Sequence, residues 1–277
     1  MARKALCIGI NNYPGTDMDL QGCVNDATDW AGVLGERGFK VASLLDEQAT
    51  KAAMLKAMGE LIAKASKGDT LVITFSGHGT YQPDTDGDEV DGLDEALCPY
   101  DLQTNGEALT DDEIRNLFLT RKSGVRIVLI SDSCHSGTVT RAAKAEKDAD
   151  SRPRFMPMGN WLPDKLLPRN RAGKVAATMT GPAGTTPFFG AYSNKLGDLL
   201  LSGCKEGPNN FSYDARIKGR FNGAFTYYAL KALKAMKPGA TYAEWHKAIT
   251  KYLPSASYPQ SPQIVGSATA RKGKIFE

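Results

Sequence analysis

The first half of the chain alternates short, almost wholly apolar runs with amphipathic segments, and this alternation constrains the fold more than any other feature. The apolar runs cover residues 5–10, 41–45, 70–75 and 125–130. Between them, residues 24–37 and 50–65 carry apolar side chains at helical spacing. A strand that is apolar throughout is buried on both faces, as in a parallel sheet covered by helices. The pattern therefore predicts an α/β fold with a mainly parallel central sheet and helices on both faces.

The second half of the chain is less regular. Thr110 and Glu113 form a predicted capping box that opens a helix reaching residue 119. Further strands are expected at residues 188–192, 199–202 and 263–266, and helices at 224–236 and 242–252. Residues 141–174 hold nine Lys/Arg, four Asp/Glu and four Pro without a hydrophobic period, which is typical of a connector. We expect a first part over residues 1–140, a flexible basic linker over 141–184, and a second part over 185–277 that completes the same domain.

Composition narrows the class of protein. With 277 residues and a net charge of +3, the chain lacks the basic excess of a nucleic-acid-binding domain. No run approaches the roughly 18 apolar residues of a membrane span. The five cysteines are odd in number and irregularly spaced, which argues against a disulfide framework or a structural zinc site. We expect a cytoplasmic protein with free thiols that binds neither nucleic acid nor membrane.

Two of the predicted strands end in residues suited to catalysis. The strand at 70–75 continues into Ser76, Gly77, His78 and Gly79, and the strand at 125–130 leads through Asp132 to Cys134. In an open parallel sheet, functional residues gather at the carboxyl ends of the strands. His78 and Cys134 can therefore face each other across a crevice at this edge.

This pair suits nucleophilic catalysis. A thiol with a pKa of about 8.5 is mostly protonated at neutral pH, and a nearby imidazole can take its proton and later deliver it to a leaving amine. The backbone N–H groups of Gly79 and Cys134 are the candidates for stabilising an oxyanion. For either residue alone, a loop histidine or a buried apolar cysteine would be the better interpretation. Both motifs, each at a strand end and in this order, indicate a cysteine peptidase.

The same segments resemble the signatures of the metacaspases and of their bacterial relatives, the orthocaspases, within the caspase-like peptidases. The matching blocks are residues 20–27 (LQGCVNDA), 75–79 (FSGHG), 91–95 (DGLDE) with 99–101 (PYD), 132–137 (DSCHSG), and 223–226 (GAFT) with 229–230 (AL). The resemblance is dense over residues 3–137 and looser over 199–253. It implies a caspase-like three-layer sandwich, although the Gln-Ala-Cys-x-Gly motif of true caspases is absent.

The resemblance also implies a specificity. Metacaspases cleave after Arg or Lys, and the acids of their primary pocket fall here on Asp26 and Asp132, with Cys23 and Ser76 beside them. A substrate cation in a partly dry pocket needs a carboxylate partner. The simpler interpretations are that Asp26 is a first-turn helix acid and that Asp132 only positions its loop.

A pocket for Arg or Lys would make the basic linker a substrate of the enzyme itself, because exposed flexible segments are preferred cleavage sites. We expect self-cleavage within residues 141–174. The candidate residues are Lys144, Lys147, Arg152, Arg154, Lys165, Arg169, Arg171 and Lys174. A solvated linker that is not cut is the alternative.

Residues 84–95 hold seven acids and no base, and such crowding favours a bound cation or full solvation. The spacing of an EF-hand is not met. Many metacaspases are activated by calcium, and the resemblance implies Asp94, Asp111 and Asp112 as ligands, whereas Arg141 stands where a further acid is expected. Asp111 and Asp112 are equally explained as first-turn acids of a capped helix. The chemistry itself requires no cofactor, and calcium is left open as an activator.

The expected partners are protein or peptide substrates with an exposed Arg or Lys, and the family implies a monomer. One rival is a catalytically silent caspase-like module that only binds partners, but such a role would not require both His78 and Cys134. A Rossmann-like nucleotide binder is disfavoured because neither Gly-x-Gly-x-x-Gly nor a Walker loop is present. An Asp-specific caspase is disfavoured by the acids in the inferred pocket.

Overall fold

The centre of the protein is a six-stranded sheet with the spatial order β12-β9-β7-β3-β1-β2. The computed structural model describes residues 1–84, 93–134, 150–167, 198–205 and 210–277. The strands are β12 (Gln263–Gly266), β9 (Leu199–Ser202), β7 (Arg126–Asp132), β3 (Thr70–Ser76), β1 (Arg3–Gly9) and β2 (Lys40–Leu45). All neighbours pair in parallel except β12, which is antiparallel to β9. This confirms the predicted mainly parallel sheet.

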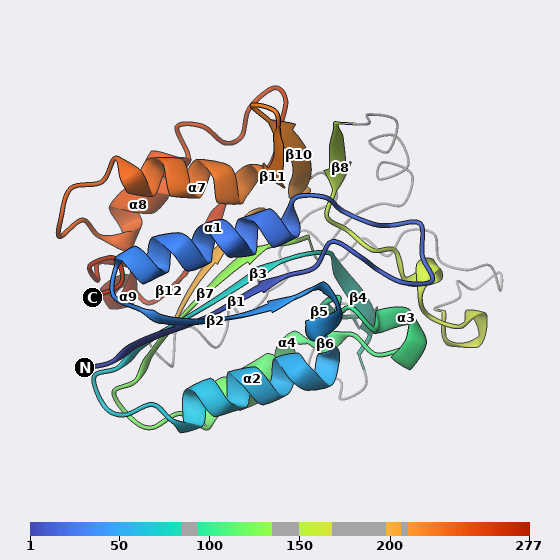
Figure 1. The fold of residues 1–277 in the computed structure, drawn as a ribbon, viewed down its shortest axis with the longest axis horizontal. Helices are drawn as coiled ribbons and strands as arrows, with labels where there is room; N and C mark the ends of the chain where they lie inside the picture. Colours follow the sequence, from blue (N-terminus) through green and yellow to red (C-terminus); the bar gives the residue numbers. More distant parts are fainter. Residues whose placement is uncertain (85–92, 135–149, 168–197, 206–209) are drawn as a thin grey trace.

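Helices cover both faces of the sheet, which gives three layers (Figure 1). On one face lie α1 (Cys23–Glu36), α7 (Ala224–Lys234) and α8 (Tyr242–Ile249), and on the other α2 (Lys51–Ala63) and α4 (Asp111–Leu119). Each face has its own apolar core. The short helices α3 (Leu102–Asn105) and α9 (Ala268–Arg271) complete the set in the described part. Among the described residues, no helix combines the length and the apolar character needed to cross a bilayer.

The helix starts follow the local chemistry of the sequence. The Thr50 hydroxyl accepts a hydrogen bond from the N–H of Ala53 at the start of α2. Thr110 and Glu113 form the predicted reciprocal capping box at the start of α4. These side chains satisfy N–H groups that have no partner within their helices. The predicted strand at 188–192 lies outside the described residues.

Two small antiparallel sheets lie beyond the carboxyl ends of the central strands. One has the order β4 (Gly79–Pro83), β5 (Leu93–Leu97) and β6 (Leu109–Thr110). The other has the order β11 (Arg220–Gly223), β10 (Tyr213–Ile217) and β8 (Ser151–Pro153). None of these six strands was predicted from the sequence.

The linker is partly ordered. Within the expected flexible segment, residues 150–167 form β8 and the short 3-10 helices Met158–Asn160 and Asp164–Leu166. Phe155, Met156 and Trp161 of this segment are buried in the apolar clusters of the body. The prediction of a flexible connector is therefore wrong for residues 150–167, because apolar side chains without a regular period anchor the segment. Residues 141–149 and 168–184 lie outside the described residues.

Candidate active site

The parallel pairing of β3 and β7 brings the two predicted catalytic residues to one edge of the sheet. The register sets Ser76 opposite Asp132 at the last position of both strands. His78 and Cys134 each follow two residues later, and their side chains are 1% and 0% exposed. The structure therefore places both residues in a buried site just beyond the strand ends.

The His78 side chain is held in one orientation by residues near the N-terminus. Its Nε2 lies 2.6 Å from the Met18 carbonyl oxygen, which can only accept, so we assign the imidazole proton to Nε2. The Tyr13 hydroxyl accepts the backbone N–H of His78 at 2.7 Å. Nδ1 is buried without a hydrogen-bond partner in the described part of the protein. The neutral tautomer thus leaves the Nδ1 lone pair free to accept a proton.

Burial keeps the imidazole neutral. It lowers the pKa of His78 to about 4, and the hydrogen bond to the Met18 carbonyl opposes that shift only in part. Burial and the neighbouring Cys204 raise the pKa of the Cys134 thiol well above its ordinary value. In this arrangement the pair consists of a thiol and a neutral imidazole rather than a thiolate and an imidazolium.

Two further residues contact the Cys134 sulfur. The backbone N–H of Ser212 donates to Sγ, and the Sγ of Cys204 lies 3.5 Å away. Ser212 directly precedes β10, and Cys204 follows β9. Both positions come from the C-terminal part of the chain, so the cysteine is enclosed by residues far from it in the sequence.

The carbonyl oxygen of Arg154 lies between two backbone N–H groups next to Cys134. It accepts the N–H groups of Gly79 and Cys134, each at 3.1 Å. These are the two donors proposed for the oxyanion. The N–H of Arg154 donates to the Ser212 carbonyl at 2.8 Å, which continues the antiparallel pairing of β8 with β10. The linker therefore lies in the site as an extended strand, with one carbonyl between both donors.

The Arg154 side chain is fully buried among three carboxylates. Its Nη2 lies 2.7 Å from Asp26 Oδ2 and 2.9 Å from Asp214 Oδ1. Its Nη1 lies 3.4 Å from Asp132 Oδ2 and 3.1 Å from the Asp132 carbonyl. A buried guanidinium is tolerated only with such partners. Asp26 and Asp132, predicted to bind a substrate cation, thus meet around one guanidinium.

Backbone donors at the start of α7 hold two of the acids in place. Asp26 accepts the N–H of Gly223 at 3.0 Å and the side-chain amide of Asn222 at 2.9 Å. Asp132 accepts the N–H and the hydroxyl of Thr226 at 2.8 and 2.7 Å. The block at residues 223–226 therefore positions the pocket. A negative charge at a helix N-terminus is also favoured by the helix dipole.

Three buried carboxyl groups share a single guanidinium in this pocket. Burial raises the pKa of Asp26 to about 7, with Arg154 opposing the shift and Asp132 adding to it. Burial likewise raises the pKa of the Cys23 thiol, and the positive charge of the nearby Arg154 opposes this shift. Ser76 ends β3 in register with Asp132. The predicted pocket residues Cys23 and Ser76 therefore border the same site.

Asp214 was not predicted as a site residue, although its carboxylate lies 2.9 Å from the guanidinium, against 2.7 Å for Asp26. Its carboxylate also accepts the N–H groups of Gln21 and Gly22 at 2.8 and 3.0 Å. It sits in β10, a strand without a clear period in the irregular half of the chain. Met18, Ser212 and Cys204 were also not predicted as site residues. Met18 contacts His78, whereas Ser212 and Cys204 reach Cys134 from segments far away in the sequence.

The predicted calcium ligands do not form a cluster in the described part of the chain. Asp94 lies in β5, and its Oδ2 is 3.5 Å from the side-chain amide of Gln82. Asp111 and Asp112 lie in the first turn of α4, where Asp112 forms an ion pair with Arg115. Among the described residues, no group of three or more His, Cys, Asp or Glu side chains could hold a metal. Arg141 and acidic residues 86–91 lie outside the described ranges.

A cavity of about 190 Å³ lies beside His78. Its walls are Asp17, Met18 and Leu20 on one side and the linker residues Arg152 and Pro153 on the other. The guanidinium of Arg152 donates to the Asp19 carbonyl at 3.2 Å. Linker residues therefore line the cavity beside the imidazole.

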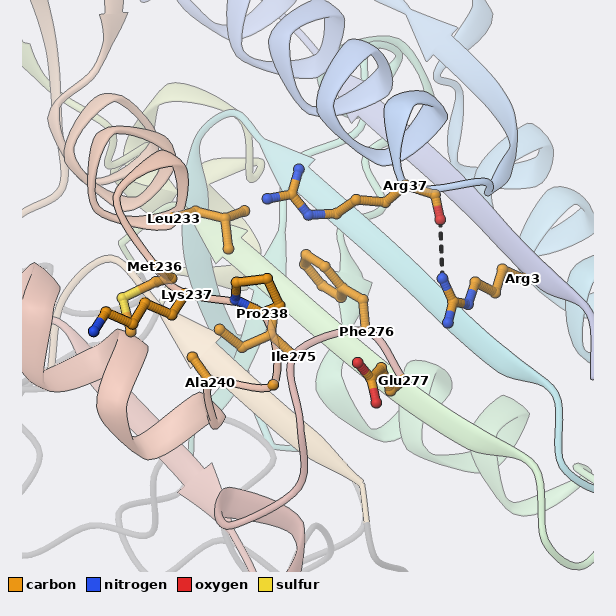
Figure 2. A pocket seen from close by; sticks show the side chains of 11 residues that line it. Arg3, Arg37, Leu233, Met236, Lys237, Pro238, Ala240, Ile275, Phe276 and Glu277 are labelled. Atoms are coloured by element: carbon orange, nitrogen blue, oxygen red, sulfur yellow. Dashed lines mark hydrogen bonds between the residues drawn. The ribbon is translucent and has the colours of Figure 1, made fainter.

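A larger cavity of about 270 Å³ lies elsewhere, next to the first residue of β1 (Figure 2). Three basic residues, Arg3, Arg37 and Lys237, line it together with Glu277. No cysteine or histidine is among its lining residues. Of these two cavities, only the smaller one borders His78.

Comparison with known proteins places this geometry in a family. The profile of the metacaspase peptidase C14 domain matches residues 3–143. Metacaspase-1B of Aspergillus oryzae is 32% identical over 298 residues, which cover 95% of this chain and 67% of that protein. Metacaspase-1A of Neurospora crassa is 33% identical over 291 residues, which cover 96% of this chain and 63% of that protein. The chain thus spans between 63% and 67% of the length of these two relatives.

Solved structures share the fold. A crystal structure from Geobacter sulfurreducens matches with a TM-score of 0.71 and 30% identity, covering 100% of this chain and 98% of that one. Caspase-1 of Spodoptera frugiperda matches with a TM-score of 0.53 at 12% identity, covering 95% of this chain and 85% of that one. The second likeness shows that the three-layer sandwich is caspase-like.

Proposed function

This chain belongs to the metacaspase family of cysteine peptidases, and from that premise we propose that it cleaves peptide bonds after Arg or Lys and processes its own linker. One observation carries the proposal. The Arg154 carbonyl accepts two N–H groups beside Cys134 while the Arg154 guanidinium lies among three carboxylates. A substrate residue poised for attack would make the same contacts.

In the proposed mechanism, Cys134 Sγ attacks the Arg154 carbonyl carbon while His78 Nδ1 takes the thiol proton. The N–H groups of Gly79 and Cys134 stabilise the resulting oxyanion, as preorganised donors do in acyl transfer. The imidazolium then protonates the Phe155 nitrogen, the bond to Phe155 breaks, and a thioester to Arg154 remains. Water, deprotonated by His78, hydrolyses the thioester.

The preference for a basic residue follows from the charge of the pocket. Asp26, Asp132 and Asp214 surround a single cation with little solvent. An acidic side chain there would be repelled by all three and would lose its hydration. Arginine also matches the acids with a planar fork that a lysine ammonium cannot reproduce. We therefore expect Arg to be cut faster than Lys, and Asp not to be cut.

A catalytically silent binding module is the rival function. It would also bury Arg154 among the acids, but it would not need a buried His78 Nδ1 without a hydrogen-bond partner at the same edge of the sheet as a buried thiol. Calcium activation is a separate proposal that rests on the family resemblance, since the described acids form no metal cluster. One set of activity measurements tests both whether the protein is a peptidase and whether calcium activates it.

The test uses fluorogenic or quenched peptides with Arg, Lys or Asp before the scissile bond, assayed with calcium and with chelator. Wild type should cut the Arg and Lys peptides, and Cys134→Ala and His78→Ala should not. Asp26→Asn and Asp214→Asn should lower kcat/KM for Arg peptides by about ten-fold or more, the loss expected for one charge-assisted contact. Cleavage only after Asp would contradict the pocket, and no cleavage by wild type in either condition would favour the silent module.

A further inference from the structure

The residue that follows Arg154 lies in an aromatic pocket that the reaction chemistry does not require. The Phe155 side chain is 0% exposed. Its ring stacks on Tyr81 with centroids 5.7 Å apart and planes inclined by 26°. The Phe211 ring lies 6.5 Å away at an angle of 56°. Both distances fall in the range of favourable aromatic pairs.

The walls of this pocket come from both parts of the chain. Tyr81 is in β4, Leu93 is in β5, Cys204 follows β9, and Phe211 precedes β10. Met158, three residues after Phe155, closes the cluster together with Leu167. Cys134 belongs to the same cluster, so the pocket adjoins the nucleophile directly. Among these wall residues there is no charged side chain.

The backbone holds the residue after the scissile bond at a defined position. Gly79 and Phe155 form an isolated parallel bridge, and the N–H of Met156 donates to the Gly79 carbonyl at 2.8 Å. Gly79 thus binds the linker on both sides of the Arg154–Phe155 bond, through its N–H before the bond and its carbonyl after it. Any peptide bound in the same register would direct its corresponding side chain toward Tyr81 and Phe211.

Resting on the proposed function, we propose that this cluster is a specificity subsite for the leaving side of the substrate. It selects an aromatic or large apolar residue immediately after the scissile bond. The substrate class is therefore a basic residue followed by an aromatic or large apolar one, not a basic residue alone. The residues that determine this selectivity are Tyr81 and Phe211.

The reaction itself favours emptying the subsite after self-cleavage. Scission converts the Phe155 amide into an α-amino group with a pKa of about 7.7–8.0, which is mostly charged at neutral pH. A charged amine beside the apolar walls and the buried Cys134 is costly unless it moves into water. Movement of the new N-terminus into water would leave the pocket available to a second peptide.

The test compares quenched-fluorescence peptides that copy the linker, Ser-Arg-Pro-Arg-X-Met-Pro-Met, with X as Phe, Ala or Asp. The processed full chain should cut the Phe peptide with a kcat/KM about ten-fold or more above the Ala peptide, because only Phe fills the pocket. The Asp peptide should be slower than the Ala peptide, since its carboxylate would lie unpaired among apolar walls.

Three variants assign the selectivity to the pocket. Tyr81→Ala should reduce the Phe-to-Ala ratio several-fold, while Tyr81→Phe should keep it because the ring remains. If Tyr81→Ala does not fold, the Phe-to-Ala ratio is measured on Phe211→Leu instead. The matched control is Tyr252→Ala, which removes a tyrosine stacked on Tyr228 at 5.2 Å in the helical layer and should leave the ratio unchanged.

The outcomes separate the two proposals. Cleavage of both peptides by wild type at equal kcat/KM would overturn the subsite and leave the proposed peptidase intact. A Phe preference that survives in Tyr81→Ala and Phe211→Leu would also overturn the assigned pocket. Failure of wild type to cut either peptide would overturn the proposed function and the subsite with it.

Discussion

Arg154 is the residue on which the electrostatics of the site depend. It is fully buried and contacts Asp26, Asp132 and Asp214. Removing one member of such a group leaves the other buried charges without a partner. This destabilises a protein more than replacing the whole group with apolar residues does. The same residue that marks the proposed cleavage site therefore also holds the uncleaved fold together.

Replacing this arginine should destabilise the protein in a pH-dependent way. In a Cys134→Ala background, Arg154→Gln should lower the free energy of unfolding by roughly 3–5 kcal/mol at neutral pH. Burial already raises the pKa of Asp26 to about 7, and loss of the guanidinium that opposes this shift raises it further. A raised folded-state pKa contributes stability at low pH that is lost as pH rises through it, so the deficit should be smaller at pH 5 than at pH 8.

Urea unfolding at the two pH values measures this effect. The matched control is Arg152→Gln, which removes a partly exposed arginine whose guanidinium donates to the Asp19 carbonyl. It should change stability by no more than about 0.5 kcal/mol. Equal losses for the two variants, or a deficit that shrinks toward pH 8, would contradict the buried-charge account.

His78 should set the acid limit of self-processing. Its pKa is lowered to about 4 by burial, and only the neutral imidazole can take the Cys134 proton. The rate of linker cleavage should therefore stay near its maximum down to about pH 5 and fall toward pH 4. A rate series on freshly purified chain, with circular dichroism at each pH, tests this. A decline centred near pH 6.5, with the fold intact, would show that the imidazole is solvated during the reaction.

At the scale of elements, the sequence predicts those strands and helix starts that depend on residues close together in the chain. Apolar runs identify the central strands β1, β3 and β7, and hydroxyl caps identify the starts of α2 and α4, because each signal lies within a few residues. The position of the proposed catalytic residues at one edge of the sheet could also be predicted, because each lies two residues after such a strand. The strands β4, β8 and β10 were not predicted, since they are short and gain their stability from partners distant in the sequence. Asp214 was missed for the same reason.

The junction between β11 and α7 offers a test at this scale. A Cβ atom on Gly223 would overlap the Asp132 carboxylate and the Arg154 guanidinium. The backbone there, at φ −66° and ψ 132°, would accept alanine without strain. The added methyl group fills space that the buried guanidinium occupies, so Gly223→Ala should lower the stability of the uncleaved chain and abolish linker cleavage or slow it by at least about ten-fold. Circular dichroism of the variant shows whether the chain still folds.

The matched control is Gly32→Ala in α1, where a Cβ would meet no atom within 4 Å. That variant should cleave its linker at the wild-type rate and gain slightly in stability, as alanine does in a helix. Gel analysis of both variants over time gives the comparison. Normal cleavage in Gly223→Ala would show that the pocket between Asp26 and Asp132 does not receive the cleaved residue.

At the scale of the whole molecule, the two sides of the proposed cut share one fold. β7 pairs in parallel with β9, so the sheet continues across the linker. Helices α1 and α7, from the two parts, pack in the same apolar cluster. After scission the two fragments should therefore stay associated and elute as one species of unchanged size in gel filtration without denaturant. Separate elution of the fragments would show that the linker, rather than the shared core, joins them.

The most direct measurement of the central claim is the identity of the cut made by the chain on itself. Wild type, Cys134→Ala and Arg154→Gln would be incubated under identical conditions and their fragments read by intact mass and N-terminal sequencing. We predict a wild-type fragment that begins at Phe155, no cleavage in Cys134→Ala, and loss of this fragment in Arg154→Gln. A cut at another linker residue with Arg154–Phe155 left intact, or a Phe155 fragment that persists in Cys134→Ala, would contradict the account.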